Sequence, residues 1–174
     1  MMRKKESPEK REEPFEDVAE CHRVALKHYV DLHTEEKFRA DLFKPMKEKY
    51  PNISLGNLKN FIKGKSPLSE KKRIQVASFL GFRYEEFIAL GRKLMDLKES
   101  GMLPDEPDAE ALSLNRAAGK IFQEFQDRHD LSDMNMAHVL GMDSMEYSFK
   151  KRGLIPFSFE EIETAFQEAD EKAL

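Results

Sequence analysis

The chain has 174 residues, of which 40% are hydrophobic and 36% charged, and its formal net charge is −4. That length and composition fit one large or two small globular domains and leave no room for a large enzyme core. No apolar run approaches the roughly 20 residues of a membrane-spanning helix, and the N-terminal segment lacks the apolar centre of a signal peptide. We therefore expect a cytoplasmic protein without a membrane partner.

Charge differs between the two ends of the chain. From Phe15 to Leu103 there are 17 Lys and Arg against 13 Asp and Glu, a balance of +4, whereas from Glu110 to Leu174 there are 7 against 13, a balance of −6. The basic first half and the acidic second half are expected to meet different partners. The eight glycines and eight prolines fall mostly between segments of helical periodicity, which predicts an all-α fold.

The first half, residues 15–100, is predicted to contain five helices after a disordered tail at residues 1–14, where basic and acidic side chains alternate and nothing can be buried. Apolar residues recur at helical spacing from Phe15 to Val30, which marks the first helix. Thr34 can cap the second helix, and Pro45 is expected to kink or break it because proline removes a helical hydrogen bond.

The third predicted helix lies in the segment NISLGNLKNFIKGK, residues 52–65. Ser54 is a good N-cap and Gly64 a natural C-terminal stop, so this helix is short. Two further helices are predicted, one from Ser69 to Gly81 and one from near Tyr84 to Leu97, and they complete the first half.

Residues 101–110 contain glycine, two prolines and several acids, which predicts a linker. Residues 111–174 are expected to form four helices. The first has Ile121, Phe122 and Phe125 on one face. The second and third lie on either side of Gly141, and the last starts at a capping box formed by Ser158 and Glu161.

A helix pair joined by a tight turn containing glycine is the geometry that places side chains in the DNA major groove. The segment 131–153 has this pattern and resembles the lambda-repressor and Cro-like (XRE-type) helix-turn-helix family. Ala137 lets the helices approach, Gly141 makes the turn and Asp143 caps the second helix. The positions that match the family pattern in register are Leu131, Ser132, Met136, Ala137, Leu140, Gly141, Met142, Asp143, Tyr147 and Gly153.

The segment 53–65 resembles the recognition helix of the same family. Ile53 takes the apolar turn position, Ser54 the cap, Leu58 and Phe61 the buried positions and Gly64 the stop. The residues before it, FKPMKEKYPN, lack the family's Ala and Leu-Gly and contain two prolines, which predicts a longer turn. We thus expect two small all-α domains of lambda-repressor-like type in tandem, both partly degenerate.

The resemblance implies a transcriptional regulator, with a phage-type repressor as one form it can take, that binds double-stranded DNA, commonly as a homodimer on a palindromic site. Asn pairs well with adenine, and Lys reaches guanine or phosphate. The DNA-binding residues expected in the first domain are Asn57, Lys59, Asn60, Lys63, Lys65, Lys71, Lys72 and Arg73.

In the second domain the recognition-like helix carries Asp143 and Glu146 where bases would be approached, and phosphate would repel them. This helix is therefore expected to serve dimerisation or partner binding, with DNA reading as the alternative. The residues of this second surface are Ser144, Met145, Ser148, Lys150, Lys151 and Arg152.

No phosphate-binding glycine loop, nucleophile motif or metal-ligand set appears in the sequence, so no enzyme activity, cofactor, metal or small-molecule substrate is predicted. The rival hypothesis is a protein-interaction adaptor that keeps the helix-turn-helix fold without binding DNA. The net charge of −4 and the proline-containing turn favour that alternative.

Overall fold

The structure is a computed structural model that describes residues 14–104 and 108–172, and within those ranges it is built from helices without any strand. The all-α prediction is thus confirmed for these residues. The tail predicted at residues 1–14 lies outside the described residues except for Pro14, where the first helix begins. No helix in the two described ranges is long and apolar enough to cross a membrane.

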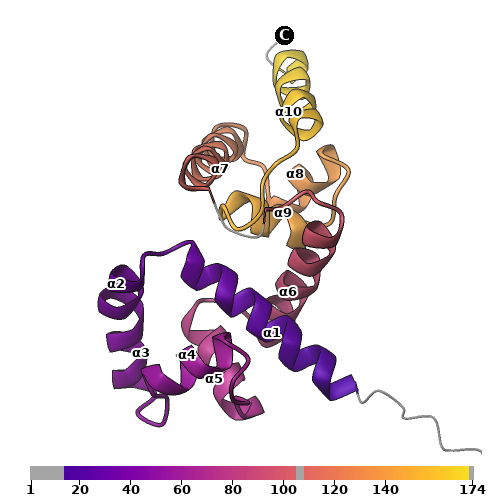
Figure 1. Cartoon of the computed structure of the whole chain (residues 1–174). Helices are drawn as coiled ribbons and strands as arrows, with labels where there is room; N and C mark the ends of the chain where they lie inside the picture. Colours follow the sequence, from indigo (N-terminus) through magenta and orange to yellow (C-terminus); the bar gives the residue numbers. More distant parts are fainter. Residues whose placement is uncertain (1–13, 105–107, 173–174) are drawn as a thin grey trace, which may run out of the picture.

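The first half begins with the long helix α1 (Pro14–Asp31) and continues into a composite helix of α2 (Glu35–Lys37), η1 (Phe38–Phe43) and α3 (Lys44–Lys49). Three helices follow, which are α4 (Leu55–Ile62), α5 (Glu70–Phe79) and α6 (Tyr84–Glu99) (Figure 1). Helix α1 packs against α6 and α4, and their apolar sides enclose a core that includes the fully buried Leu26, Leu58 and Leu90.

The composite helix shows how the chain accommodates Pro45. Proline has no N–H group to donate, and its ring clashes with the carbonyl four residues before it. The preceding turn, η1, is a π-helix in which the N–H of Lys44 donates to the carbonyl of Arg39, five residues back. This wider turn takes up the distortion, so the helix is not broken at Pro45 and continues to Lys49.

The ends of α4 agree with the boundaries predicted from Ser54 and Gly64. The Ser54 hydroxyl accepts a hydrogen bond of 3.1 Å from the N–H of Asn57, which satisfies one free donor of the first turn. At the other end Gly64 has a φ of +68°, and the N–H of Lys65 donates to the carbonyl of Asn60 at 2.8 Å. Both ends of this helix are therefore determined locally.

The close approach of α1 and α6 depends on Gly91. A Cβ atom added at Gly91 would lie 1.9 Å from the carbonyl oxygen of Cys21, which is backbone of α1 and cannot rotate away. The pair of helices at the centre of the first half therefore requires a residue without a side chain at this position.

Replacing Gly91 by Ala is expected to lower the free energy of unfolding by about 1–3 kcal/mol or more, because α6 must move away from α1. Gly56 in α4 is the matched control, since a Cβ added there would meet nothing within 4 Å. There the same change is expected to raise stability by up to about 1 kcal/mol, through helix propensity alone. Urea unfolding of both variants measures the difference, and equal stabilities would contradict the close contact.

The second half consists of α7 (Ala109–His129), α8 (Asp133–Val139), α9 (Ser144–Lys151) and α10 (Phe159–Lys172). The predicted caps are in place: the Asp143 carboxylate accepts from the N–H groups of Met145 and Glu146, each at 2.9 Å. Ser158 and Glu161 form the predicted capping box, with bonds of 2.7 and 3.2 Å. Gly141, with a φ of +67°, makes the turn between α8 and α9.

The second half contributes to the core of the first half and also has a smaller core of its own. Phe149, Leu154 and Ile155 come from the second half but are buried in the same apolar cluster as α1, α4 and α6. A smaller cluster, which includes Phe122 and Tyr147, lies between α7, α8 and α9. The predicted boundary at residues 101–110 falls in the break between α6 and α7, yet the helix pair α8–α9 packs back onto the first half (Figure 1).

Polar contacts accompany this apolar junction. His28 donates from Nε2 to the carbonyl of Leu154 at 2.6 Å, and burial lowers the pKa of His28, so the ring is neutral. The guanidinium of Arg116 donates to the carbonyl of Leu32 at 3.0 Å. These bonds satisfy backbone carbonyls at the ends of elements, and they fix the orientation of one half on the other.

Candidate nucleic-acid interface

Helix α4 presents a polar side to solvent, as the sequence predicted. Leu58 and Phe61 are buried in the core, whereas Asn57, Asn60 and Lys63 are exposed. The three exposed residues are separated by intervals of three, which places them along one side of the helix. Their amide and ammonium groups can donate to base edges or to phosphate.

The turn before α4 is held by a contact with α5. The side chain of Asn52 donates to that of Gln75 at 3.1 Å, and Ile53 is fully buried beneath the turn. The turn from α3 to α4 spans residues 50–54 and is thus longer than a tight helix-turn-helix turn, in line with the expectation from Pro51. Asn52 and Gln75 were not singled out from the sequence, because their contact joins residues 23 positions apart.

Lys59 is only partly available to a ligand. Its ammonium forms an ion pair with the carboxylate of Glu35 in α2, and this neighbour lowers the pKa of the Glu35 carboxyl. Both side chains are at the surface, so the pair is screened by solvent and can open at small cost. Among the lysines predicted in the first domain, Lys59 therefore differs in having an ion-pair partner within residues 14–104 and 108–172.

Arg73 is not part of the exposed surface, which corrects its assignment as a phosphate contact. It is 8% exposed, and its guanidinium donates to the Tyr84 hydroxyl at 3.0 Å and to the carbonyl of Leu68 at 3.1 Å. Its own carbonyl accepts a bond of 3.0 Å from His22. Arg73 thus braces the start of α5 against α6 and α1, and its charge is turned inward.

The basic character of this region is stronger than the predicted residues alone indicate. Residues 49–84 contain eight Lys and Arg and a single acid, Glu70. Lys63, Lys65 and Lys71 are exposed and Lys72 is half-buried, and none of the four forms an ion pair with a residue in the described ranges. These four lysines, two in the loop between α4 and α5 and two in the first turn of α5, form what we name the α4–α5 basic surface.

The second recognition-like helix, α9, is enclosed by the protein itself. Its apolar side chains point in two directions: Tyr147 into the second-half cluster, and Met145 and Phe149 against the first-half core. Of the second predicted surface, only Ser144 and Arg152 count as exposed. The partner that α9 contacts is the first half of its own chain, so this helix does not offer an open face to DNA.

The basic residues at the end of α9 all have partners within the protein, Lys150 and Lys151 in the second half and Arg152 in the first half. Lys150 is 6% exposed, and its ammonium donates to the carboxylate of Glu161 at 2.7 Å. It also forms an ion pair with Glu146 at 3.3 Å. Lys151 forms an ion pair with Asp133 at 2.5 Å. The guanidinium of Arg152 stacks 3.7 Å from the ring centroid of Phe82 and donates to the carbonyl of Leu80 at 3.3 Å. These three cations therefore stabilise packing and do not form a phosphate-binding cluster.

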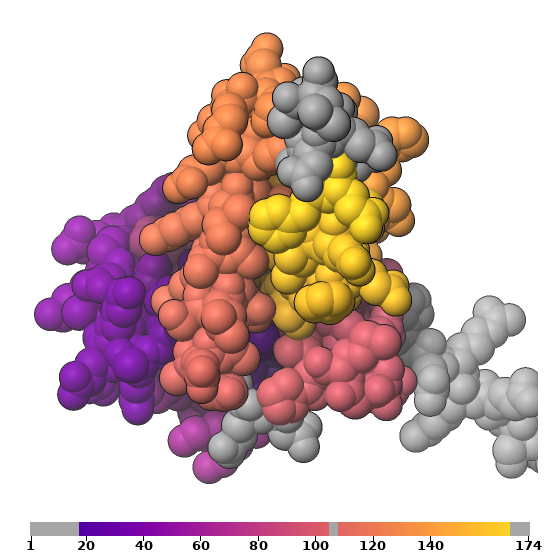
Figure 2. All heavy atoms as spheres, turned by 90° about the horizontal axis from the view of Figure 1, so that it is seen from above, coloured from indigo at the N-terminus to yellow at the C-terminus, as the bar shows by residue number. Residues whose placement is uncertain are grey.

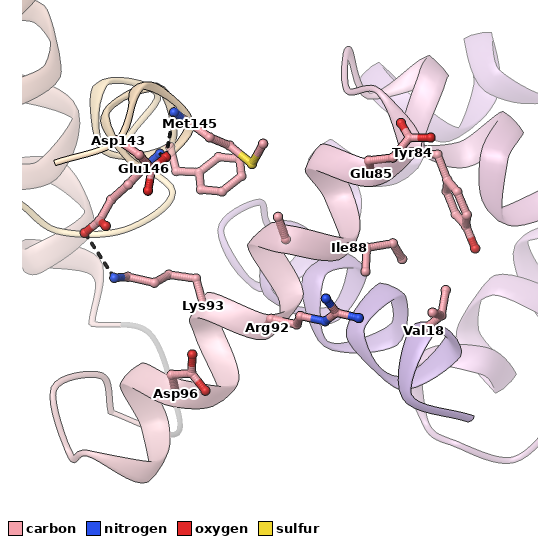
Figure 3. Close-up of a pocket in the computed structure, with 12 residues that line it drawn as sticks. Val18, Tyr84, Glu85, Ile88, Arg92, Lys93, Asp96, Asp143, Met145 and Glu146 are labelled. Carbon is pink, nitrogen blue, oxygen red and sulfur yellow. Dashed lines mark hydrogen bonds and ion pairs between the residues drawn. The ribbon is translucent and has the colours of Figure 1, made fainter. Parts of the chain in front are cut away.

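A cleft of about 530 Å³ remains where α9 meets α6 (Figure 3). Val18 and Ile88 form part of its apolar wall, and Lys93 from α6 bridges to Glu146 of α9 at 3.1 Å. The charged residues that line the cleft come from both sides of it, with Arg92 and Asp96 on α6 and Asp143 at the start of α9. The cleft lies between the two halves of the chain.

In the part of the chain that the structure describes, no group of three or more His, Cys, Asp or Glu side chains could hold a metal ion. Comparisons of this chain with protein-family models, with curated proteins and with solved structures gave no match.

Proposed function

We propose that this protein binds double-stranded DNA as a transcriptional regulator of helix-turn-helix type and that α4 is its recognition helix. In this proposal the composite helix of α2, η1 and α3 crosses the DNA backbone, and α4 enters the major groove. Asn57 and Asn60 read base edges, and Lys63, Lys65, Lys71 and Lys72 contact phosphates.

The observation that carries the proposal is the α4–α5 basic surface beside an exposed polar helix side. Four lysines without an ion pair in the described chain lie in the loop after α4 and in the first turn of α5, and α4 itself presents two asparagines to solvent. An accumulation of like charge raises the electrostatic free energy of the folded protein, and a polyanion relieves it. Gly56 adds to this argument, because its open surroundings allow a ligand backbone to approach the first turn of α4 closely.

The rival function is a protein-interaction adaptor with the same fold and no affinity for DNA. One observation favours it: α9, the helix whose sequence matches the lambda-repressor-like pattern in register, packs against protein on two sides, through Tyr147 and through Met145 and Phe149. If α4 serves in the same way, a protein partner covers the α4–α5 basic surface. The two functions differ in their response to salt and to loss of the lysines.

Fluorescence anisotropy with a mixed-sequence duplex of about three helical turns tests the proposal. If four lysines neutralise phosphates, the affinity of the unaltered protein is expected to fall about 150-fold between 50 and 200 mM salt, at about 0.9 released counterions per contact. In a Lys63→Ala/Lys65→Ala variant two contacts are lost, so the same salt change is expected to weaken binding only about 12-fold.

Lys120→Ala is the control, because it removes an exposed positive charge from α7 in the other half. Its salt dependence is expected to equal that of the unaltered protein. Absence of binding at 50 mM salt would refute DNA binding and favour the adaptor, as would an equal salt dependence of the Lys63→Ala/Lys65→Ala and Lys120→Ala variants.

A further inference from the structure

The acidic residue Glu35 lies against the cationic side of α4. It belongs to the first turn of α2, where the Thr34 hydroxyl accepts a hydrogen bond of 3.3 Å from the N–H of Lys37 and fixes the start of the helix. The Glu35 carboxylate forms its ion pair with Lys59, which lies 24 positions further along the chain. The fold therefore brings an anion to the helix that is proposed to enter the major groove.

Glu35 faces more than one positive charge. Glu35, Lys59 and Lys63 are among the residues that line a groove of about 280 Å³ between the end of α1, the composite helix and α4. Lys59 and Lys63 are four positions apart, so they are neighbours on one side of α4. The pKa of the Glu35 carboxyl is lowered chiefly by Lys59, with a smaller contribution from Lys63. Asp31, the other acid at this groove, is instead paired with Lys27 at 2.6 Å.

The ion pair between Glu35 and Lys59 lies on an open surface. The side chain of Glu35 is 65% exposed and that of Lys59 is 37% exposed. Helix α7 of the second half reaches the turn before α2, where Arg116 bonds to the carbonyl of Leu32. In Figure 2 the indigo and violet atoms of the first half nevertheless remain uncovered beside α7. A ligand as large as DNA therefore has access to both charges.

Glu35 changes what Lys59 can contribute to DNA binding. A lysine that neutralises a phosphate releases a counterion, and this release is the source of sequence-independent affinity. While Lys59 is paired with Glu35, the two charges sum to zero. If a phosphate takes Lys59, the carboxylate is left uncompensated beside a polyanion, and that repulsion offsets the new contact. In both arrangements Lys59 adds no net phosphate contact.

We propose that Glu35 limits the affinity of this protein for DNA by keeping Lys59 from contributing a phosphate contact. This role rests on the proposed function, since it requires α4 to bind DNA. Glu35 acts through Lys59 and is thus a positioning residue. Because phosphate contacts carry no sequence information, the limit applies to every duplex, and it keeps the protein from being retained on the many sites that are not its target.

Glu35→Gln keeps the length and shape of the side chain and removes its charge, so Lys59 becomes a fifth phosphate contact. Fluorescence anisotropy with the same mixed-sequence duplex is expected to show an affinity raised about 10-fold at 50 mM salt and about 3-fold at 200 mM salt. The loss of affinity between these two salt concentrations is expected to grow from about 150-fold to about 500-fold.

Glu36→Gln is the matched control for this prediction. Glu36 is exposed in the same turn of α2 and forms no ion pair with a residue of the described chain. The affinity of this variant is expected to stay within about 2-fold of that of the unaltered protein, with the same salt dependence. Equal gains from Glu35→Gln and Glu36→Gln would contradict a specific role of Glu35.

Removing both partners tests whether Glu35 acts through Lys59. The Lys59→Ala/Glu35→Gln variant is expected to bind like the unaltered protein, because the fifth contact is lost with the lysine. Circular dichroism confirms that each variant remains helical. An unchanged salt dependence of Glu35→Gln, or a gain of about 10-fold that persists without Lys59, would overturn the role of Glu35 and leave DNA binding by α4 intact. Absence of binding by every variant at 50 mM salt would instead refute the proposed function, and the role of Glu35 with it.

Discussion

Replacing Phe149 by Ala is expected to lower the free energy of unfolding by about 3–5 kcal/mol, although Phe149 belongs to the acidic half. Its side chain is 4% exposed and lies in the core that α1, α4 and α6 form. The truncation therefore leaves a cavity at the junction and weakens both halves together. Urea unfolding followed by circular dichroism measures the change in stability.

Phe159→Ala is the matched control for this prediction. Phe159 is a phenylalanine of the same half but is 80% exposed, so its truncation is expected to change stability by less than about 0.5 kcal/mol. Because the halves share a core, Phe149→Ala is also expected to unfold in one transition. Two separate transitions, or a cost below that of Phe159→Ala, would show that the halves are independent domains.

Acidification is expected to destabilise the protein through His22. This residue is fully buried, with its ring 4.8 Å from that of Phe87, and its Nδ1 has no hydrogen-bond partner among the described residues. Burial lowers the pKa of His22 to about 4, from a usual value of 6.5. The folded state thus excludes a proton that the unfolded chain binds.

The stability contributed by neutral His22 is complete above pH 6.5 and is lost progressively as the pH falls toward 4. At pH 4 the loss amounts to about 3 kcal/mol. His22→Gln keeps a donor for the carbonyl of Arg73 but has no proton to gain. The variant is expected to be less stable at pH 7, because it loses the aromatic contacts. Between pH 7 and 4 it is expected to lose about 3 kcal/mol less than the unaltered protein. Parallel pH profiles of the two proteins would contradict this role.

Helix boundaries were predictable because short-range hydrogen bonds determine them. Ser54 and Asp143 bond to N–H groups only two or three residues away, and Gly64 and Gly141 adopt left-handed conformations that favour glycine. Such interactions lie within a few residues of sequence, so they can be recognised without the tertiary fold. The sequence also identified the inward side of α4, through Leu58 and Phe61.

The direction of charged side chains was not predictable in the same way. Arg73 follows two lysines in a basic run, yet its guanidinium is bonded to Leu68 and Tyr84. Lys59 has an acidic partner 24 residues away in α2. A long side chain at the edge between the buried and exposed sides of a helix can turn inward or outward. Its direction depends on hydrogen-bond acceptors that only the folded chain brings near.

The place of α9 was decided by tertiary packing, although the sequence contained an indication of it. Met145, Tyr147 and Phe149 alternate along the helix, so they cannot all lie on one side, and a helix with apolar residues on two sides must be buried between two layers. The sequence by itself determined that the chain is helical, where its helices begin and end, and that positive charge gathers around α4, because these properties depend on neighbouring residues. Only the tertiary structure decided that α9 packs on the first half and that Lys150 and Lys151 are paired with carboxylates of the second half, since burial depends on surfaces that residues distant in sequence supply.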